Sequence, residues 1–254
     1  MNLRMMANRL ILFFVVFSLS LGCSSFNRIF QKDNYNYYST EFQCSDKSGW
    51  HDAAKFEAFH TIWNLVRATY REENKKIKNS DVVIVGNSLV HLFLPELVKQ
   101  EFPGVSIVQR GIGGDMSDLL IERISDNVLN LNPKTIIIEI GGNDLINGKC
   151  LSYLEKNILT LIEKIRKEGP AVKIIFISVP PTKNISLNSI VPVYNLFLSG
   201  LPKKFSSLYF VDAWSEMREK DLPIIKEEFT RPGDKIHFNE KGYGVWGRLI
   251  RPLL

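Results

Sequence analysis

The stretch VVIVGNSLV, residues 82–90, joins a run of β-branched apolar residues to Gly86 and Asn87 and then to Ser88. A run without a polar face is typical of a strand that is buried on both sides of a parallel sheet. Gly86 and Asn87 end that strand, and Ser88 opens a helix directly behind it. The stretch therefore predicts a strand-to-helix turn that exposes a hydroxyl group and leaves a backbone N–H free at the helix start.

On both sides of this stretch, strand-like and helix-like segments alternate. Strands are expected at 81–85, 105–108, 135–140, 173–177 and 208–211, and helices at 52–78, 88–101, 115–131, 151–168, 187–205 and 239–250. Buried strands joined by helical crossovers predict an α/β fold with three layers, α/β/α, around a five-stranded parallel sheet. Ligands of such sheets bind at the carboxyl ends of the strands.

Length and composition are consistent with one catalytic-sized domain. The chain has 254 residues, of which 45% are hydrophobic and 23% charged, and this is enough for one sizeable core. The formal net charge of +5 includes Arg4 and Arg9. The remaining balance is too mild to indicate a nucleic-acid partner, and nothing in the sequence indicates an oligomeric state.

The N-terminus reads as an export signal. Arg4 and Arg9 precede an apolar run, LILFFVVFSLSL, that is short for a membrane span. Gly22 before Cys23 resembles a bacterial lipobox, although Ser20 stands where that pattern prefers leucine. We expect residues 1–23 to be a signal peptide and Cys23 to be lipidated. The protein would then be a membrane-anchored lipoprotein of a bacterial cell envelope, located in the periplasm or at the outer membrane. The alternative is ordinary cleavage nearby, which would release a secreted protein.

Residues 24–50 are polar and rich in Asn, Ser and Tyr, which is typical of a tether, and the catalytic-sized domain is expected at 51–254. Export permits a disulfide between Cys44 and Cys150, but two isolated thiols are more often simply buried side chains. The four histidines are scattered and show no metal-ligand spacing. We expect neither a metal nor an organic cofactor.

Ser88 needs a base within hydrogen-bond reach if it is to act as a nucleophile. In RPGDKIHFNEKGY, Asp234 and His237 are three residues apart, so a helical turn would place both on one face, where Asp234 can orient the imidazole. The alternative for this pair is a solvated aspartate and a capping histidine. His91 is a second candidate base, although it is expected at the rim of the site.

Developing negative charge on a substrate oxygen requires several fixed hydrogen-bond donors. The backbone N–H groups of Ser88 and Gly114 and the side-chain amide of Asn143 follow three different strands and can supply them. Gly111 and Gly113 are assigned to turn geometry. An alternative reading of GIGGD, a phosphate-binding loop, lacks the expected glycine pattern after the first strand. Apolar residues after Ser88 fit either a core or an acyl-binding wall: Leu92, Phe93, Leu94 and Leu97.

With these residues in place, the chain resembles the SGNH hydrolases, the GDSL-type esterase and lipase family. Its four blocks occur in the family order as VGNS, RGIGGD, GGND and DKIH, and RGIGGD with GGND looks most like the platelet-activating-factor acetylhydrolase branch. The resemblance implies a flavodoxin-like SGNH hydrolase fold. It also implies a triad of Ser88, Asp234 and His237, with an oxyanion hole formed by Ser88, Gly114 and Asn143.

Two positions depart from the family pattern. Asn87 stands where the family usually has aspartate, and Met116, expected at the rim of the site, stands where threonine is common. The resemblance implies a serine esterase that acts on short acyl or acetyl esters of a small molecule, lipid or glycan. The alternatives are a silent member that binds an envelope glycan or lipid, and an acyltransferase or lysophospholipase of the same fold.

Overall fold

The computed structural model describes residues 53–254, which all belong to one structural unit. Its centre is a five-stranded sheet in the order β2-β1-β3-β4-β5, and every strand pair is parallel. The strands are β1 (Val82–Gly86), β2 (Ile107–Gly111), β3 (Thr135–Glu139), β4 (Lys173–Ile177) and β5 (Leu208–Val211). This order is the flavodoxin-like one, so the predicted sheet is confirmed.

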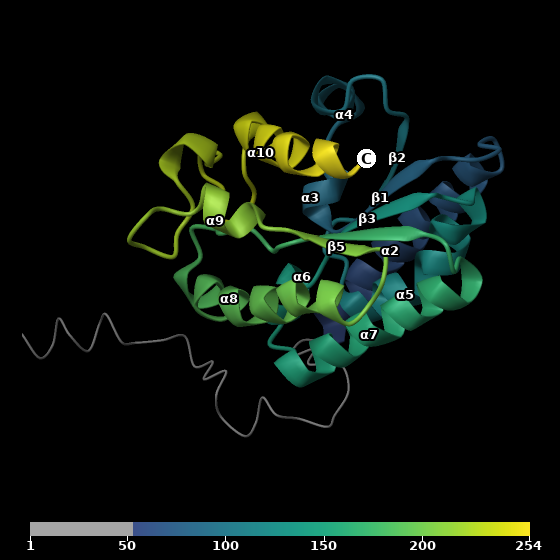
Figure 1. The fold of residues 1–254 in the computed structure, drawn as a ribbon. Coiled ribbons are helices and arrows are strands. Elements are labelled where there is room, and N and C mark those ends of the chain that lie inside the picture. Colours follow the sequence, from purple (N-terminus) through teal and green to yellow (C-terminus); the bar gives the residue numbers. More distant parts are fainter. Residues whose placement is uncertain (1–52) are drawn as a thin grey trace, which may run out of the picture. The chain divides into compact units, whose positions relative to one another are not determined.

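Helices cover both faces of the sheet, as Figure 1 shows. One face carries α5 (Ser117–Asn127), α7 (Leu151–Glu168) and α8 (Ile185–Gly200), and the other carries α3 (Ser88–His91), α4 (Pro95–Glu101) and α10 (Glu240–Ile250). Side chains alternate along β3, so that Ile136 and Ile138 pack with the first group of helices and Ile137 with the second. The predicted three-layer architecture is therefore confirmed.

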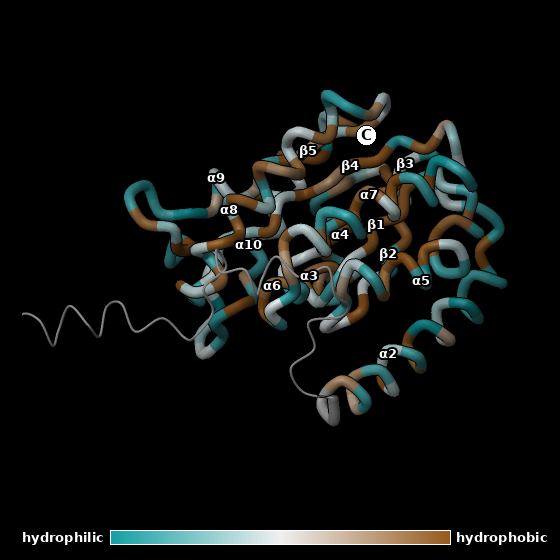
Figure 2. The backbone as a smooth tube through the Cα atoms, turned by 90° about the horizontal axis from the view of Figure 1, so that it is seen from below, coloured by the Kyte–Doolittle hydropathy of each residue, from teal (hydrophilic) through white to brown (hydrophobic). Residues whose placement is uncertain are grey.

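Helix α2 (Ala53–Asn74) precedes the sheet, and hydrophobic and hydrophilic residues alternate along it, visible in Figure 2 as brown and teal segments. Trp63 on this helix is fully buried against Ile112, Met116 and Leu119. None of the helices between residues 53 and 254 is both long and apolar enough to cross a membrane. Short helices complete the fold: α6 (Gly142–Ile146), α9 (Ala213–Met217), η2 (Leu129–Leu131), η3 (Leu201–Lys203), η4 (Glu227–Phe229) and η5 (Arg251–Leu253).

Several predicted boundaries are wrong. The helix expected at 88–101 is two helices, α3 and α4, because Leu94 is extended (φ −57°, ψ 150°) in front of Pro95. The strand expected at 105–108 is β2 and reaches Gly111. Met116 does not line a rim, since it is fully buried in the cluster around Trp63.

Candidate active site

Four loops at the carboxyl ends of the strands carry the candidate residues. Ser88 follows β1, Gly114 follows β2 and Asn143 follows β3, whereas Asp234 and His237 lie in the loop that leads to α10. The structure brings Ser88, Asp234 and His237 into direct contact, although Ser88 and His237 are 149 residues apart in the sequence. Asn143 lines the same small cavity as Ser88.

A continuous line of hydrogen bonds joins three of these side chains. The Ser88 hydroxyl lies 2.8 Å from Nε2 of His237, and Nδ1 of His237 lies 2.8 Å from Oδ2 of Asp234. With Nδ1–H donating to the carboxylate, Nε2 is left as the acceptor for the serine proton. The arrangement can therefore activate Ser88 for attack on a carbonyl carbon.

The loop that holds Asp234 and His237 is not the turn of helix that the sequence suggested. Instead, Oδ1 of Asp234 accepts hydrogen bonds from the backbone N–H groups of Ile236 (2.8 Å) and His237 (2.9 Å), so the carboxylate folds the loop around itself. Partial burial raises the pKa of Asp234, but these backbone donors and the His237 ring outweigh it and lower the pKa to about 2. Asp234 is therefore ionised at neutral pH.

Asn87 fixes the turn that presents Ser88. Its side-chain oxygen accepts a hydrogen bond from the backbone N–H of Leu89 (2.9 Å) and so caps α3. Tyr243 of α10 donates to the carbonyl of Leu89 (2.8 Å), which ties the same turn to the helix that follows His237. An amide at this position, where the family pattern has aspartate, therefore still fixes the loop through its side-chain oxygen.

Gly114 and Asn143, the other proposed oxyanion donors, belong to adjacent loops. The side-chain amide of Asn143 donates to the backbone carbonyl of Asp115, the residue after Gly114, at 3.0 Å. Gly114 has φ +80°, and a Cβ atom there would lie 2.7 Å from the ring of Phe59, so this position requires glycine. Gly113 lies in the turn closed by the hydrogen bond from Asp115 N–H to the Ile112 carbonyl (3.1 Å), as expected, but it has neither constraint.

A buried ionic group supports this loop and was not found in the sequence. Asp115 is fully buried, pairs with Arg123 at 2.7 Å, and accepts a hydrogen bond from the indole of Trp63 at 2.9 Å. Burial raises the pKa of Asp115, and Arg123 opposes this shift. Arg123 also donates to the carbonyl of Gly86 at 3.2 Å, so the group links α2 and α5 to the strand before Ser88.

The cavity beside Ser88 is small, about 20 Å³, which is room for roughly one water molecule. Its lining combines polar groups near Ser88 with apolar side chains from α6, the loop after β4 and α8, including Ile146, Val179 and Leu187. Glu139, the last residue of β3, also lines it. The sequence offered one signal for Glu139, a single acid at the end of the apolar run TIII.

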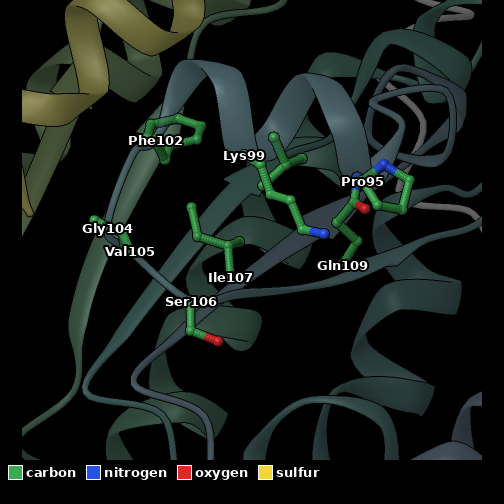
Figure 3. A pocket seen from close by; sticks show the side chains of 9 residues that line it. Pro95, Lys99, Phe102, Gly104, Val105, Ser106, Ile107 and Gln109 are labelled. Atoms are coloured by element: carbon green, nitrogen blue, oxygen red, sulfur yellow. The ribbon is translucent and has the colours of Figure 1, made fainter.

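Other candidates lie away from this cavity. His91 is exposed, and its Nδ1 lies 3.1 Å from the carbonyl of Gly111, whereas the Ser88 hydroxyl meets His237 instead. Phe93 is buried in the core, and none of the four residues of the suggested acyl-binding wall lines the cavity. A larger cavity of about 390 Å³ lies between α4 and β2, lined by residues such as Lys99 and Gln109, and Figure 3 shows it without any of the candidate catalytic residues.

Three sequence predictions fall on residues outside the part of the chain that the structure describes. These are the signal peptide at 1–23 with Cys23, the tether at 24–50, and Cys44, which is the suggested disulfide partner of Cys150. They stay predictions. Among residues 53–254, no group of three or more His, Cys, Asp or Glu side chains is arranged to hold a metal ion.

Comparisons with known proteins identify related sequences. The GDSL-like lipase/acylhydrolase family model matches residues 84–245. Esterase TesA of Pseudomonas aeruginosa is 32% identical over 75 residues, which are 30% of this chain and only 37% of TesA. The match thus spans little more than a third of that curated relative.

Solved structures share the fold. A Streptococcus pneumonia protein described provisionally as a platelet activating factor superposes with a TM-score of 0.71 at 19% identity, covering 79% of this chain and 96% of that one. The acetyl xylan esterase AlAXEase gives a TM-score of 0.58 at 19% identity, covering 68% and 99%. Since the family model spans more than half of the sequence, the chain belongs to the GDSL-like lipase/acylhydrolase family.

Proposed function

We propose that this protein is a serine esterase that hydrolyses short acyl esters, of the acetyl type, through an acyl-enzyme intermediate. The observation that carries the proposal is the line of 2.8 Å contacts from Ser88 through His237 to Asp234. Such a line gives a serine hydroxyl the base that it lacks on its own. In this proposal Ser88 is the nucleophile, His237 the general base and then acid, and Asp234 the orienting carboxylate.

The proposed reaction has two halves. Ser88 Oγ attacks the ester carbonyl carbon while its proton moves to Nε2 of His237, and Asp234 stabilises the imidazolium that forms. The oxyanion accepts hydrogen bonds from the N–H groups of Ser88 and Gly114 and from the amide of Asn143. His237 then gives its proton to the leaving alcohol. In the second half water attacks the acyl-enzyme in the same way, and the carboxylic acid leaves.

The size of the cavity supports a short acyl group. A space of about 20 Å³ next to Ser88 matches a methyl group in size, whereas an extended alkyl chain would reach beyond it. Ile146 of α6 stands at the edge of this space and is 39% exposed, so truncating it opens the cavity with little loss of core packing. The acyl preference can therefore be tested without unfolding the protein.

The test is a series of p-nitrophenyl esters from acetate to palmitate. We expect kcat/KM to be highest for acetate in the wild-type protein, and Ile146→Ala to shift the preference toward butyrate and longer chains. Leu94→Ala is the matched control, because Leu94 is also exposed but does not line the cavity. Equal rates along the series, or a wild-type optimum at long chains, would contradict the acetyl-type proposal.

We further propose that the protein is exported and anchored to a bacterial membrane through a lipid on Cys23. The support is the sequence alone, namely the basic and apolar N-terminus followed by Gly22 and Cys23. In cells that express the full chain, Cys23→Ala should move the protein from the membrane fraction to the soluble fraction. Unchanged partitioning would refute the anchor while leaving the esterase proposal intact.

A further inference from the structure

Glu139 holds a buried carboxyl group in the cavity that the proposed hydrolysis does not use. It is 0% exposed and pairs in register with Gly86, directly before Asn87 and Ser88. A Cβ atom on Gly86 would lie 2.0 Å from the Glu139 carbonyl oxygen, so β1 and β3 run very close together here. We propose that Glu139 is a positioning residue: in its uncharged acid form it holds the Asn87 side chain, and through Asn87 the turn that carries Ser88.

Asn87 is the polar neighbour of this carboxyl group. The amide oxygen of Asn87 already accepts from the N–H of Leu89, so the amide nitrogen is the group left to meet Glu139. Neither oxygen of Glu139 has a hydrogen bond of normal geometry within the described part of the chain. Burial raises the pKa of Glu139 to about 8, and the nearby Asn87 amide opposes this shift. The uncharged acid is thus the form that the fold accommodates at neutral pH.

Titratable or charged side chains approach the region around Glu139 from four helices and two loops. They are Arg123 of α5, Asp144 of α6, Tyr194 of α8 and Tyr243 of α10, together with Asp115 and His237 from the loops. Arg123 is already paired with Asp115, and the carboxylate of Asp144 is bound by Ser117. The pKa values of both tyrosines are raised, first by burial and also by Glu139, so the tyrosines are uncharged at neutral pH.

Ionisation of Glu139 would oppose the reaction proposed for Ser88. The two residues line the same cavity of about 20 Å³, where little solvent screens a charge. A carboxylate there repels the oxyanion that forms beside Ser88. The inference rests on the proposed esterase function, and it predicts that activity declines as the pH rises through about 8.

Enzyme kinetics test the inference with a pair of variants. Glu139→Gln keeps an uncharged group of the same shape, so kcat at pH 7 should stay within about threefold of wild type while the alkaline decline disappears. Glu139→Met removes the polar contact to Asn87 and should lower kcat at least about tenfold at every pH, with a smaller effect on KM. The matched control is Glu101→Gln, a largely buried carboxyl group outside the cavity that pairs with Arg251, and it should leave the alkaline decline unchanged.

Two further readouts do not depend on activity. At pH 6.5 the infrared difference spectrum between wild type and Glu139→Gln should contain the carbonyl band of a protonated carboxyl group. Because the pKa is raised in the folded protein, the stability contribution of Glu139 is fully present below 4.5 and lost as the pH rises through about 8. Wild type should therefore lose stability relative to Glu139→Gln over this interval.

The outcomes separate the two proposals. A missing carboxyl band, or the same alkaline decline in wild type and Glu139→Gln, overturns the role of Glu139 even if esters are hydrolysed. If wild type hydrolyses no ester, the esterase proposal fails instead, whereas the carboxyl band would still support the uncharged form of Glu139.

Discussion

Ser88 depends on a few short contacts for its place in the molecule. Its hydroxyl meets His237, its backbone starts α3 under the cap of Asn87, and its neighbour Leu89 is held by Tyr243. Asp234 folds the opposite loop by accepting two backbone N–H groups as well as the imidazole. At the scale of single residues, the site is therefore built from side chains that bond to the backbone as well as to one another.

Replacing Asp234 by asparagine should keep the fold of the loop but remove the charge that orients His237. The amide of Asn can still accept from the backbone, yet it no longer favours the tautomer in which Nε2 accepts the serine proton. We expect kcat for p-nitrophenyl acetate to fall by roughly 10³- to 10⁴-fold, with little change in melting temperature.

The control is Asp212→Asn, because Asp212 caps α9 by the same kind of backbone bond (Ser215 N, 3.0 Å) but does not touch the histidine. An Asp234→Asn variant with near wild-type kcat would show that the carboxylate is not needed. Since the pKa of Asp234 is about 2, its own titration should not appear in the pH profile above about pH 4.

At the scale of elements, the structure depends on close approaches between backbone segments. The strands, the long helices and the loops that carry Ser88, Gly114, Asn143 and His237 could all be predicted, because buried β-branched runs and glycine-rich turns leave clear patterns. The break before Pro95 and the five-residue helices α6 and α9 were missed, since such short helices complete no recognisable period. Contacts between distant segments, such as Asp115 with Trp63, leave no local pattern at all.

Gly111, at the end of β2, allows α3 to approach the sheet. A Cβ atom there would lie 2.3 Å from the backbone nitrogen of His91, so Gly111→Ala should push α3 outward. We expect a loss of roughly 1–3 kcal/mol in the free energy of unfolding and a lower kcat, because α3 carries Ser88.

Gly113→Ala is the matched control for stability, since a Cβ atom at Gly113, in the loop that follows, would meet nothing within 4 Å. Urea unfolding of both variants checks the prediction. Equal stability of Gly111→Ala and Gly113→Ala would show that α3 can shift without cost.

At the scale of the whole molecule, α2 connects the start of the domain to the proposed oxyanion loop. Trp63 packs on Ile112 and Met116 and donates to Asp115, which in turn holds Arg123. The residue that follows Gly114 thus depends on a helix that the four family blocks do not include. The family model likewise begins at residue 84, after α2 has ended.

Trp63→Phe should keep most of the packing of α2 and remove its hydrogen bond to a buried carboxylate. We expect the free energy of unfolding to fall by roughly 1.5–3 kcal/mol beyond the effect of the smaller ring. Trp246→Phe provides the comparison, because Trp246 is equally buried but its indole nitrogen has no hydrogen-bond partner in the described part of the chain. Thermal unfolding that ranks the two variants equally would contradict a structural role for the Trp63 bond.

The proposed chemistry of the whole molecule depends on Ser88 being the nucleophile of an ester hydrolase. The decisive measurement is the rate of p-nitrophenyl acetate hydrolysis by the purified wild-type protein and by Ser88→Ala under the same conditions. We predict that wild type turns over and that the substitution lowers kcat by roughly 10³-fold or more. Equal rates for the two proteins, at or near the uncatalysed background, would show that Ser88 is not the nucleophile for this ester.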